Sequence, residues 1–298
     1  IYFAPSNADS VLVVDPTTNI SDTTAIAGLG VGSPKWSGVV FLHTTGKLYF
    51  SPENSASVLV VDPVTNHSDL NRIAGLSEQT NKWRGVTVAP NTGKLYFCPS
   101  SANSVLIVAT IDPCVSNNCS ASCENECGWH YEQQLCRTGA TTDTLEVDAR
   151  LGDCRTHAPT QPPIRAPMSP TSTSVTKTFD VWQMEKIDTA GAVWNTWDTT
   201  SIAGLGTDIF KWSAVSFVPI TGKLYFCPRA ADSVLVVDPM TNASDSTSIA
   251  GLGVDNNKWG DVIYVHTTKK LYFPPFNADN VLVVDPLTNV SDTTAIAG

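Results

Sequence analysis

The chain has 298 residues and a formal net charge of −10, with only 18 Lys and Arg residues spread thinly along it. A nucleic-acid partner would require a basic stripe that meets the phosphates, so this charge argues against one. No run of 18 apolar residues occurs, so the sequence predicts no membrane span.

The sequence repeats itself with a fixed period. A Y-F-x-P phrase, followed in most repeats by V-L-V-V-D-P, begins at Tyr2, Tyr49, Tyr96, Tyr225 and Tyr272. Three of the four spacings are 47 residues, and the fourth, 129 residues, is one period plus 82 inserted residues. Such a period indicates units that cannot bury their own apolar faces and must stack on copies of themselves.

Each repeat contains four short stretches rich in Val, Ile, Leu, Phe and Tyr. In residues 35–75 they begin with K-W-S-G-V, K-L-Y-F, V-L-V-V-D-P and D-L-N-R-I-A-G. Turn residues bound each of them, and none has the period of a helix, so they predict four strands, A to D. We place strand D at the T-x-I-A-G segment. We therefore expect an all-β fold, a five-bladed β-propeller of 47-residue blades whose first blade lacks strand A.

The turns between these stretches fit this order. Gly46 and Gly93 stand where a tight A–B hairpin needs positive φ, and D-P-T-T-N at 15–19 has the composition of a C–D turn. The looser G-L-G-x-x-x-x-K-W stretch would link strand D of one blade to strand A of the next. Because successive strands run in opposite directions, A–B and C–D turns should share one face, and B–C and D–A loops the other.

The run N-A-D-S-V-L-V-V-D-P-T-T-N at 7–19 resembles the repeat of the YVTN/NHL-type β-propellers. The resemblance covers the repeats on both sides of the insertion and implies a propeller fold. Such propellers occur in surface proteins, scaffolds and a few enzymes. The 47-residue unit with its Trp-led inner strand is also similar in organisation to five-bladed lectins of the tachylectin type, although their G-G-W phrase is absent here.

The insertion decorates the third blade and divides the chain. We expect a first propeller part at 1–113, a disulfide-rich module at 114–156, a Pro/Ser/Thr-rich linker at 157–177 and the rest of the propeller at 178–298. Six of the eight cysteines crowd into the module, and their even number favours three disulfides over a metal site, with the pairing open: Cys114, Cys119, Cys123, Cys127, Cys136 and Cys154. The other two, Cys98 and Cys227, should be buried and unpaired.

Five N-x-S/T sequons occur, four of them at the same C–D turn: Asn19, Asn66, Asn118, Asn242 and Asn289. The T-N-x-S-D phrase is good turn chemistry in its own right, so a repeat would copy it without any glycan. An exposed sequon in a secreted chain nevertheless favours N-glycosylation. Together with the cysteine cluster, the sequons predict a secreted or cell-surface protein.

No catalytic motif appears, whether a nucleophile elbow, a zinc-binding helix, a phosphate loop or a dinucleotide loop. We therefore expect no enzyme, no cofactor and no metal. The recurrent Lys-Trp pairs are the best candidates for a ligand or partner face: Lys35, Trp36, Lys82, Trp83, Lys211, Trp212, Lys258 and Trp259. Each Trp either packs between blades as core or offers its indole face to a sugar or cation.

Three functions stay open at this point. The first is a structural or adhesive element that contacts other protein chains of an extracellular assembly. The second is a multivalent lectin whose inter-blade Lys-Trp pockets bind glycans, which a glycan array would test. The third is a propeller hydrolase or lyase, against which the near-uniform repeats argue.

Overall fold

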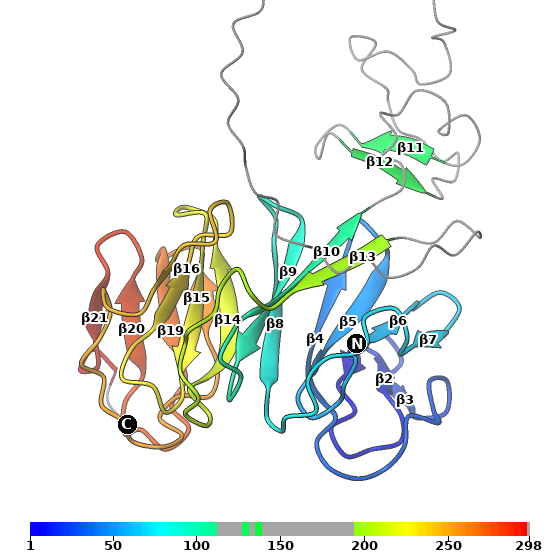
Figure 1. Ribbon diagram of the computed structural model, residues 1–298, viewed down its shortest axis with the longest axis horizontal. Helices are drawn as coiled ribbons and strands as arrows, with labels where there is room; N and C mark the ends of the chain where they lie inside the picture. The colour runs from blue at the N-terminus through cyan, green and yellow to red at the C-terminus, as the bar shows by residue number, and fades with distance from the viewer. Residues whose placement is uncertain (112–126, 131–134, 139–193, 297–298) are drawn as a thin grey trace, which may run out of the picture. The chain divides into compact units, whose positions relative to one another are not determined.

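The structure is a computed structural model that describes residues 1–111, 127–130, 135–138 and 194–296 (Figure 1). The chain forms two compact units, Ile1–Thr110 with Asn195–Gly298, and Ile111–Trp194. The described part of the second unit is an antiparallel pair, β11 (Cys127–His130) and β12 (Leu135–Thr138). The predicted module, linker and propeller boundaries between 113 and 178 lie outside the described residues.

The first unit is all-β and contains five antiparallel sheets, numbered here as blades 1 to 5 in chain order. Blade 1 has three strands and the other four blades have four each, which gives the β-propeller repeat fold that the 47-residue period predicts. The strands are, in blade 1, β1 (Tyr2–Phe3), β2 (Leu12–Asp15) and β3 (Ile20–Asp22); in blade 2, β4 (Trp36–Leu42), β5 (Lys47–Pro52), β6 (Leu59–Val61) and β7 (Ser68–Asp69); in blade 3, β8 (Trp83–Ala89), β9 (Lys94–Pro99), β10 (Leu106–Ile111) and β13 (Trp194–Asp198); in blade 4, β14 (Trp212–Val218), β15 (Lys223–Pro228), β16 (Leu235–Val237) and β17 (Ser244–Asp245); in blade 5, β18 (Ile263–Val265), β19 (Lys270–Phe273), β20 (Leu282–Asp285) and β21 (Val290–Asp292).

Blade 3 is the blade that the insertion interrupts. Its strand order is β13-β10-β9-β8, so its outer strand comes from the chain that follows the second unit. The chain leaves the blade where the other blades make their C–D turn. The sequence predicts this position, because the inserted residues follow Ile111-Asp112-Pro113 of the third repeat.

The hydrophobic core lies between successive blades. Alternate residues of a strand point to opposite faces of its sheet. On β5, Phe50 packs toward Val11 of blade 1, whereas Tyr49 packs toward Phe97 of blade 3. The same division recurs between blades 3 and 4 and between blades 4 and 5. Blades 2, 3 and 4 thus bury both of their faces by standing between two other blades.

Blades 1 and 5 lie on opposite sides of the view in Figure 1, and no hydrogen bond joins them among the described residues. Phe3 of blade 1 is 47% exposed, whereas the equivalent Phe50, Phe97, Phe226 and Phe273 are fully buried. Closure of the five blades into one ring, which the sequence predicts, is therefore not seen in this part of the chain.

Strand D lies earlier than predicted. It covers Ile20–Asp22 in blade 1, and the T-x-I-A-G segment that follows is not a strand. The Asp22 carboxylate accepts hydrogen bonds from the N–H groups of Thr24 (2.6 Å) and Ala25 (3.2 Å), an Asx-type turn that ends the strand. Ile26 is then buried, and its carbonyl accepts a hydrogen bond from the Val11 N–H (3.0 Å). The segment anchors a loop.

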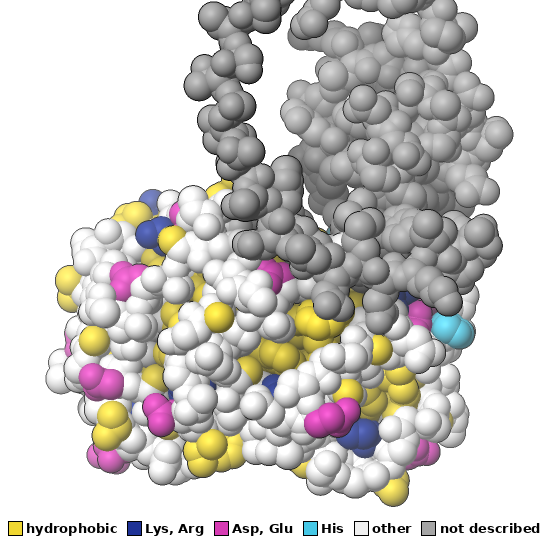
Figure 2. Space-filling view, in the orientation of Figure 1, with side chains coloured by type: hydrophobic (Ala, Val, Ile, Leu, Met, Phe, Trp, Pro, Cys, Tyr) yellow, Lys and Arg dark blue, Asp and Glu magenta, His cyan; other side chains and the backbone are white. Residues whose placement is uncertain are grey.

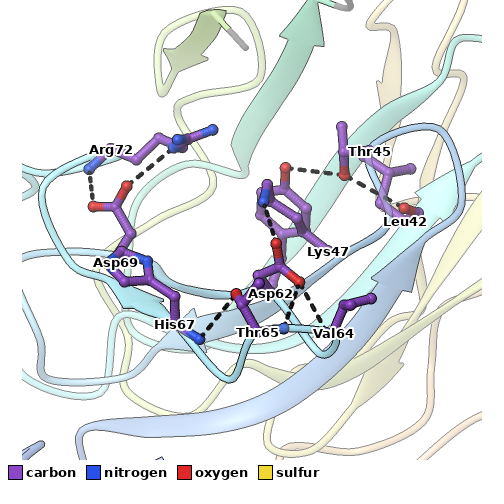
Figure 3. Close-up of polar contacts among 10 residues, drawn as sticks. Leu42, Thr45, Lys47, Asp62, Val64, Thr65, His67, Asp69 and Arg72 are labelled. Atoms are coloured by element: carbon purple, nitrogen blue, oxygen red, sulfur yellow. Dashed lines mark hydrogen bonds and ion pairs between the residues drawn. The ribbon is translucent and has the colours of Figure 1, made fainter. Parts of the chain in front are cut away.

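The A–B and C–D turns have the predicted geometry. Gly46 and Asn19 adopt positive φ, at 64° and 58°. In blade 2, the Asp62 carboxylate accepts hydrogen bonds from the backbone N–H groups of Val64 and Thr65 within its C–D turn (Figure 3). It also pairs with Lys47 next to the A–B hairpin, at 3.3 Å. This ion pair places the two kinds of turn on the same face of the blade.

Two tyrosines of strand B fasten their blade to the C–D turn of the next. Tyr96 Oη donates a hydrogen bond to the Pro239 carbonyl and Tyr225 Oη one to the Pro286 carbonyl, each at 3.1 Å and buried. In blade 2, Tyr49 Oη instead donates a hydrogen bond to Thr45 Oγ1 (3.3 Å), within its own blade. The first two bonds join neighbouring blades at their turn face.

We expect Tyr96→Phe and Tyr225→Phe each to lower the free energy of unfolding by about 1 kcal/mol, because each leaves a buried carbonyl unpaired. Tyr272→Phe is the matched control. Tyr272 occupies the same repeat position and makes no side-chain hydrogen bond among the described residues, so its substitution should change stability by less. Urea denaturation followed by circular dichroism measures all three. An equal loss at the three positions would contradict the inter-blade role.

The carboxylates at the turns make stability depend on acid pH. Hydrogen bonds from the hydroxyl and N–H of Thr17 and the hydroxyl of Thr18 lower the pKa of Asp15 to about 2. Among the described residues, the other aspartates with a lowered pKa are Asp22, Asp62, Asp69, Asp198, Asp245 and Asp292. A carboxyl whose pKa is lower in the folded state stabilises the fold above its unfolded pKa, and this contribution is lost as pH falls through the folded value.

The melting temperature should therefore be steady from pH 7 to 5 and fall steeply between pH 4 and 2. Thermal melts at each pH measure this. Asp15→Asn keeps an acceptor oxygen but cannot titrate, so the acid slope of this variant should be shallower than that of the wild type. Identical slopes for the wild type and a variant with Asn at Asp15, Asp22 and Asp292 would show that these turns do not control acid stability.

Candidate functional site

The inner strands of blades 2, 3 and 4 approach one another through their backbones. A Cβ atom built on Gly38 would lie 2.8 Å from the Arg84 carbonyl oxygen, and one on Gly85 would lie 2.8 Å from Ala214 Cα. A side chain at either glycine would therefore separate two blades. The small residues let β4, β8 and β14 meet at one place in the fold.

A cavity of about 450 Å³ opens where these strands meet the start of blade 5. We call it the inner pocket. It lies beside the B–C and D–A loops, the face opposite the sequon turns. Its polar and aromatic lining comes from Ser37, Arg84, Ser213, Arg229, Asp261 and Phe276.

Several lining residues are departures from the repeat. At the position of Arg84 the other blades carry Ser37, Ser213 and Gly260, and at the position of Arg229 they carry Ser6, Glu53, Ser100 and Phe276. A residue that only packs between blades can be the same in every blade. A set of departures that gather at one cavity makes a single site out of repeated units.

The two arginines of the pocket have separate polar partners and contact one aromatic ring. Glu53, only 2% exposed, forms an ion pair with Arg84 Nη2, and Arg229 Nε donates a hydrogen bond to Asn257 Oδ1 (2.6 Å). The guanidinium carbons of Arg84 and Arg229 lie 5.4 and 4.7 Å from the centroid of the same Phe210 ring. Burial lowers the pKa of Arg229, and the neighbouring charge of Arg84 lowers it further. The pocket thus holds two cations close together.

Phe210 is held in an unusual backbone conformation. Its φ is 58°, in the left-handed region, where the equivalent positions of blades 3 and 5 carry Asn81 and Asn257. Asn tolerates this region, whereas a bulky residue there is an outlier that costs about 1–3 kcal/mol. The ring of Phe210 contacts both guanidinium groups, so the strained residue positions the arginines.

The Lys-Trp pairs lie in the core between blades. Trp36, Trp83, Trp212 and Trp259 are at most 4% exposed, and each Nε1–H donates to a backbone carbonyl of its own B–C loop. Each Lys ammonium lies 5.7–6.0 Å from the ring of its neighbouring Trp and donates to loop carbonyls. Burial lowers the pKa of Lys82 to about 8. The indoles are therefore packed, and none presents an open face.

The other predicted site residues fall into two groups. Asn19, Asn66, Asn242 and Asn289 all stand at C–D turns with φ near 58°. Cys98 and Cys227 are free and buried, as predicted, and burial raises the pKa of Cys227 to about 12. Asn118 and the side chains of the cysteine module lie outside the described residues: Cys114, Cys119, Cys123, Cys127, Cys136 and Cys154.

The described ranges hold neither a metal-ligand cluster nor a membrane-spanning helix. No three His, Cys, Asp or Glu side chains gather there as metal ligands. No helix in that part of the chain is long and apolar enough to cross a bilayer.

The sequence interpretation missed the arginines of the inner pocket, Arg84 and Arg229, and the residues that hold them, Glu53 and Phe210. A signal for them exists in the sequence. When the repeats are aligned, Arg84 stands where the other blades carry Ser37, Ser213 and Gly260, and Glu53 and Arg229 share one repeat position that is Ser in two other blades. Their convergence in space is what the sequence does not show.

Comparison with known proteins gives likeness in structure alone. No protein-family model matches the chain, and no curated protein matches its sequence. Among solved structures, a catalytically inactive virginiamycin B lyase from Staphylococcus aureus with quinupristin is 7% identical, with a TM-score of 0.49 over 97% of this chain and 64% of that one. A streptogramin B lyase is 6% identical, with a TM-score of 0.48 over 98% of this chain and 63% of that one. An extracellular domain of a putative hybrid two-component system from B. thetaiotaomicron is 7% identical. Its TM-score is 0.47, over 100% of this chain and 28% of that one.

The chain thus spans less than two thirds of the length of each of these proteins. With TM-scores below 0.5, the likenesses carry no statement about what this chain binds or catalyses.

Proposed function

We propose that this protein is a non-enzymatic β-propeller that binds another protein of an extracellular or cell-surface assembly through its B–C and D–A loop face. The observation that carries the proposal is the convergence of repeat departures on the inner pocket of that face. A propeller needs only uniform repeats for packing, so a charged, non-uniform cavity among its loops favours recognition of a partner.

The positions of the histidines favour binding over catalysis. His is the side chain most often used for acid–base catalysis near neutral pH. Within the described blades, His43 and His266 lie at A–B turns, where their rings pack edge-on against Phe41 and Tyr264. His67 lies at a C–D turn. All three belong to the turn face, away from the inner pocket.

The extracellular setting rests on the sequence. Six cysteines within 114–154 and sequons at four exposed turns are typical of a secreted, disulfide-containing glycoprotein. We also propose that the chain is a relative of the YVTN/NHL-type propellers, on the repeat phrase at 7–19. In this arrangement glycans would cover the turn face and leave the loop face bare for a partner.

Photo-crosslinking tests the proposal. A benzoylphenylalanine is placed at Ser37, an exposed residue that lines the inner pocket, or at Met240, which is 66% exposed on the turn face. Each variant is mixed with the surface and secreted proteins of the producing cells and irradiated. We expect the Ser37 variant to form a discrete protein adduct that excess unlabelled wild type removes, and the Met240 variant to form none.

Two outcomes would overturn the proposal. One is the absence of any competed adduct at Ser37 in a correctly folded variant. The other is selective binding of a simple sugar on a glycan array, which would assign the protein to the lectins.

A further inference from the structure

The two arginines of the inner pocket carry donors that the fold does not use. Arg84 binds Glu53 through Nη2, and Arg229 binds Asn257 through Nε. A guanidinium has five N–H donors, and no other hydrogen bond from either group reaches a described residue. Arg84 Nε is buried without any partner there. Both arginines line the inner pocket, so two cations with unused donors belong to one cavity wall.

These donors are held in place before any ligand arrives. Phe210 contacts both guanidinium groups, Glu53 fixes Arg84, and Asn257 fixes Arg229. A planar guanidinium that is already ordered loses little freedom on binding. The chain offers few such groups, because only three arginines occur in the described blades, and Figure 2 shows scattered carboxylates and few basic side chains on the visible face. Two of the three arginines line this cavity.

We infer that the inner pocket binds a carboxylate, that of an Asp or Glu side chain which a partner protein inserts between Arg84 and Arg229. Guanidinium groups form paired, charge-assisted hydrogen bonds with carboxylates. Glu53 balances the charge of Arg84, so Arg229 supplies the attraction. That the carboxylate belongs to a protein rests on the proposed function. The cavity of about 450 Å³ accommodates one such side chain.

Asp261 also lines the pocket, and its carboxylate opposes an incoming negative charge. Its Oδ1 accepts a hydrogen bond from the Val262 N–H at 2.7 Å, a bond that an amide oxygen would keep. Asp261→Asn should therefore tighten carboxylate binding while the local backbone is retained. Arg229→Gln should weaken it, because the positive charge and the free N–H donors of the Arg229 guanidinium are lost.

Titration of the full chain, labelled with ¹⁵N-arginine, tests the inference by NMR. The probes are acetyl-Glu-N-methylamide, its neutral isostere acetyl-Gln-N-methylamide, and glucuronate. We expect saturable shifts of the Arg84 and Arg229 Nε–H signals with a Kd on the order of 1 mM for the Glu probe. The Gln probe and the Arg229→Gln variant should each bind roughly tenfold more weakly, and Asp261→Asn roughly threefold more tightly.

Equal responses to the Glu and Gln probes on the wild type would overturn the inference, and that comparison requires no variant to fold. Tighter binding of glucuronate than of the Glu probe would also overturn it, in favour of an acidic sugar. Thermal melts confirm that each variant is folded. A competed crosslink at Ser37 together with failure of the Glu probe would refute this inference alone and leave the proposed function standing.

Discussion

Trp212→Ala should lower the free energy of unfolding by about 3–5 kcal/mol, as truncation of a large buried aromatic residue does. Trp212 is 4% exposed and packs in the cluster between blades 3 and 4, with its Nε1–H bonded to the Ser233 carbonyl at 2.9 Å. The substitution removes that packing, leaves a buried carbonyl unpaired and exposes the buried Lys211 ammonium. Urea denaturation followed by circular dichroism and by tryptophan fluorescence measures the loss.

Trp212→Phe separates packing from the hydrogen bond. It keeps a buried ring and loses Nε1–H, so we expect a smaller loss of about 1–2 kcal/mol. Met240→Ala, at an exposed turn position, is the control for general effects of truncation and should change stability by less than about 0.5 kcal/mol. If Trp212→Ala left stability unchanged and reduced binding of a sugar, the lectin interpretation of the Lys-Trp pairs would be favoured.

The repeat architecture is the part of this protein that the sequence predicts well. Both faces of strands B and C are apolar because successive residues pack against different neighbouring blades. Tyr49 packs toward blade 3, and the next residue, Phe50, packs toward blade 1. That requirement is the same in every blade, so it repeats visibly every 47 residues. The turns are equally readable, since Gly46 and Asn19 are residues that accept positive φ.

Strand D was misplaced because two local preferences compete there. The T-x-I-A-G segment has the composition of a strand, but the preceding Asp22 captures the N–H groups of Thr24 and Ala25 and ends the ladder first. A side chain that satisfies the backbone in this way removes the groups that a strand would use. Ile26 then contributes a buried side chain and one backbone hydrogen bond.

The inner pocket escaped prediction for a different reason. Glu53, Arg84, Phe210 and Arg229 come from three blades, and each alone is an ordinary substitution within its repeat. What makes them a site is the short distance from both guanidinium groups to one ring. The left-handed conformation of Phe210 is also hard to predict from the sequence, because Phe rarely adopts it. The only indication is that the aligned residues, Asn81 and Asn257, are of a type that tolerates positive φ.

Gly85→Ala should destabilise the propeller by about 1–3 kcal/mol, and Gly85→Val by more, because the inner strands have no room for a side chain. The added Cβ would lie 2.8 Å from Ala214 Cα and 3.2 Å from the Ser213 carbonyl oxygen. Both are backbone atoms, so neither can rotate away. The strain must separate β8, which carries Arg84, from β14, and both strands line the inner pocket.

Gly260→Ala is the matched control in the same pocket. Its Cβ would meet only the Phe276 side chain, at 3.6 Å, which is ordinary van der Waals contact. Replacement of an unstrained Gly by Ala restricts the unfolded chain, so this variant should be neutral or more stable by up to about 1 kcal/mol.

Urea denaturation of both variants, with the Glu-probe titration repeated on Gly85→Ala, measures the two consequences together. We expect Gly85→Ala to lose stability and carboxylate affinity at once, since the same strand separation moves Arg84 away from Arg229. A stable Gly85→Ala protein would show instead that the blades can shift apart freely, and the close backbone contact would then not be what shapes the pocket.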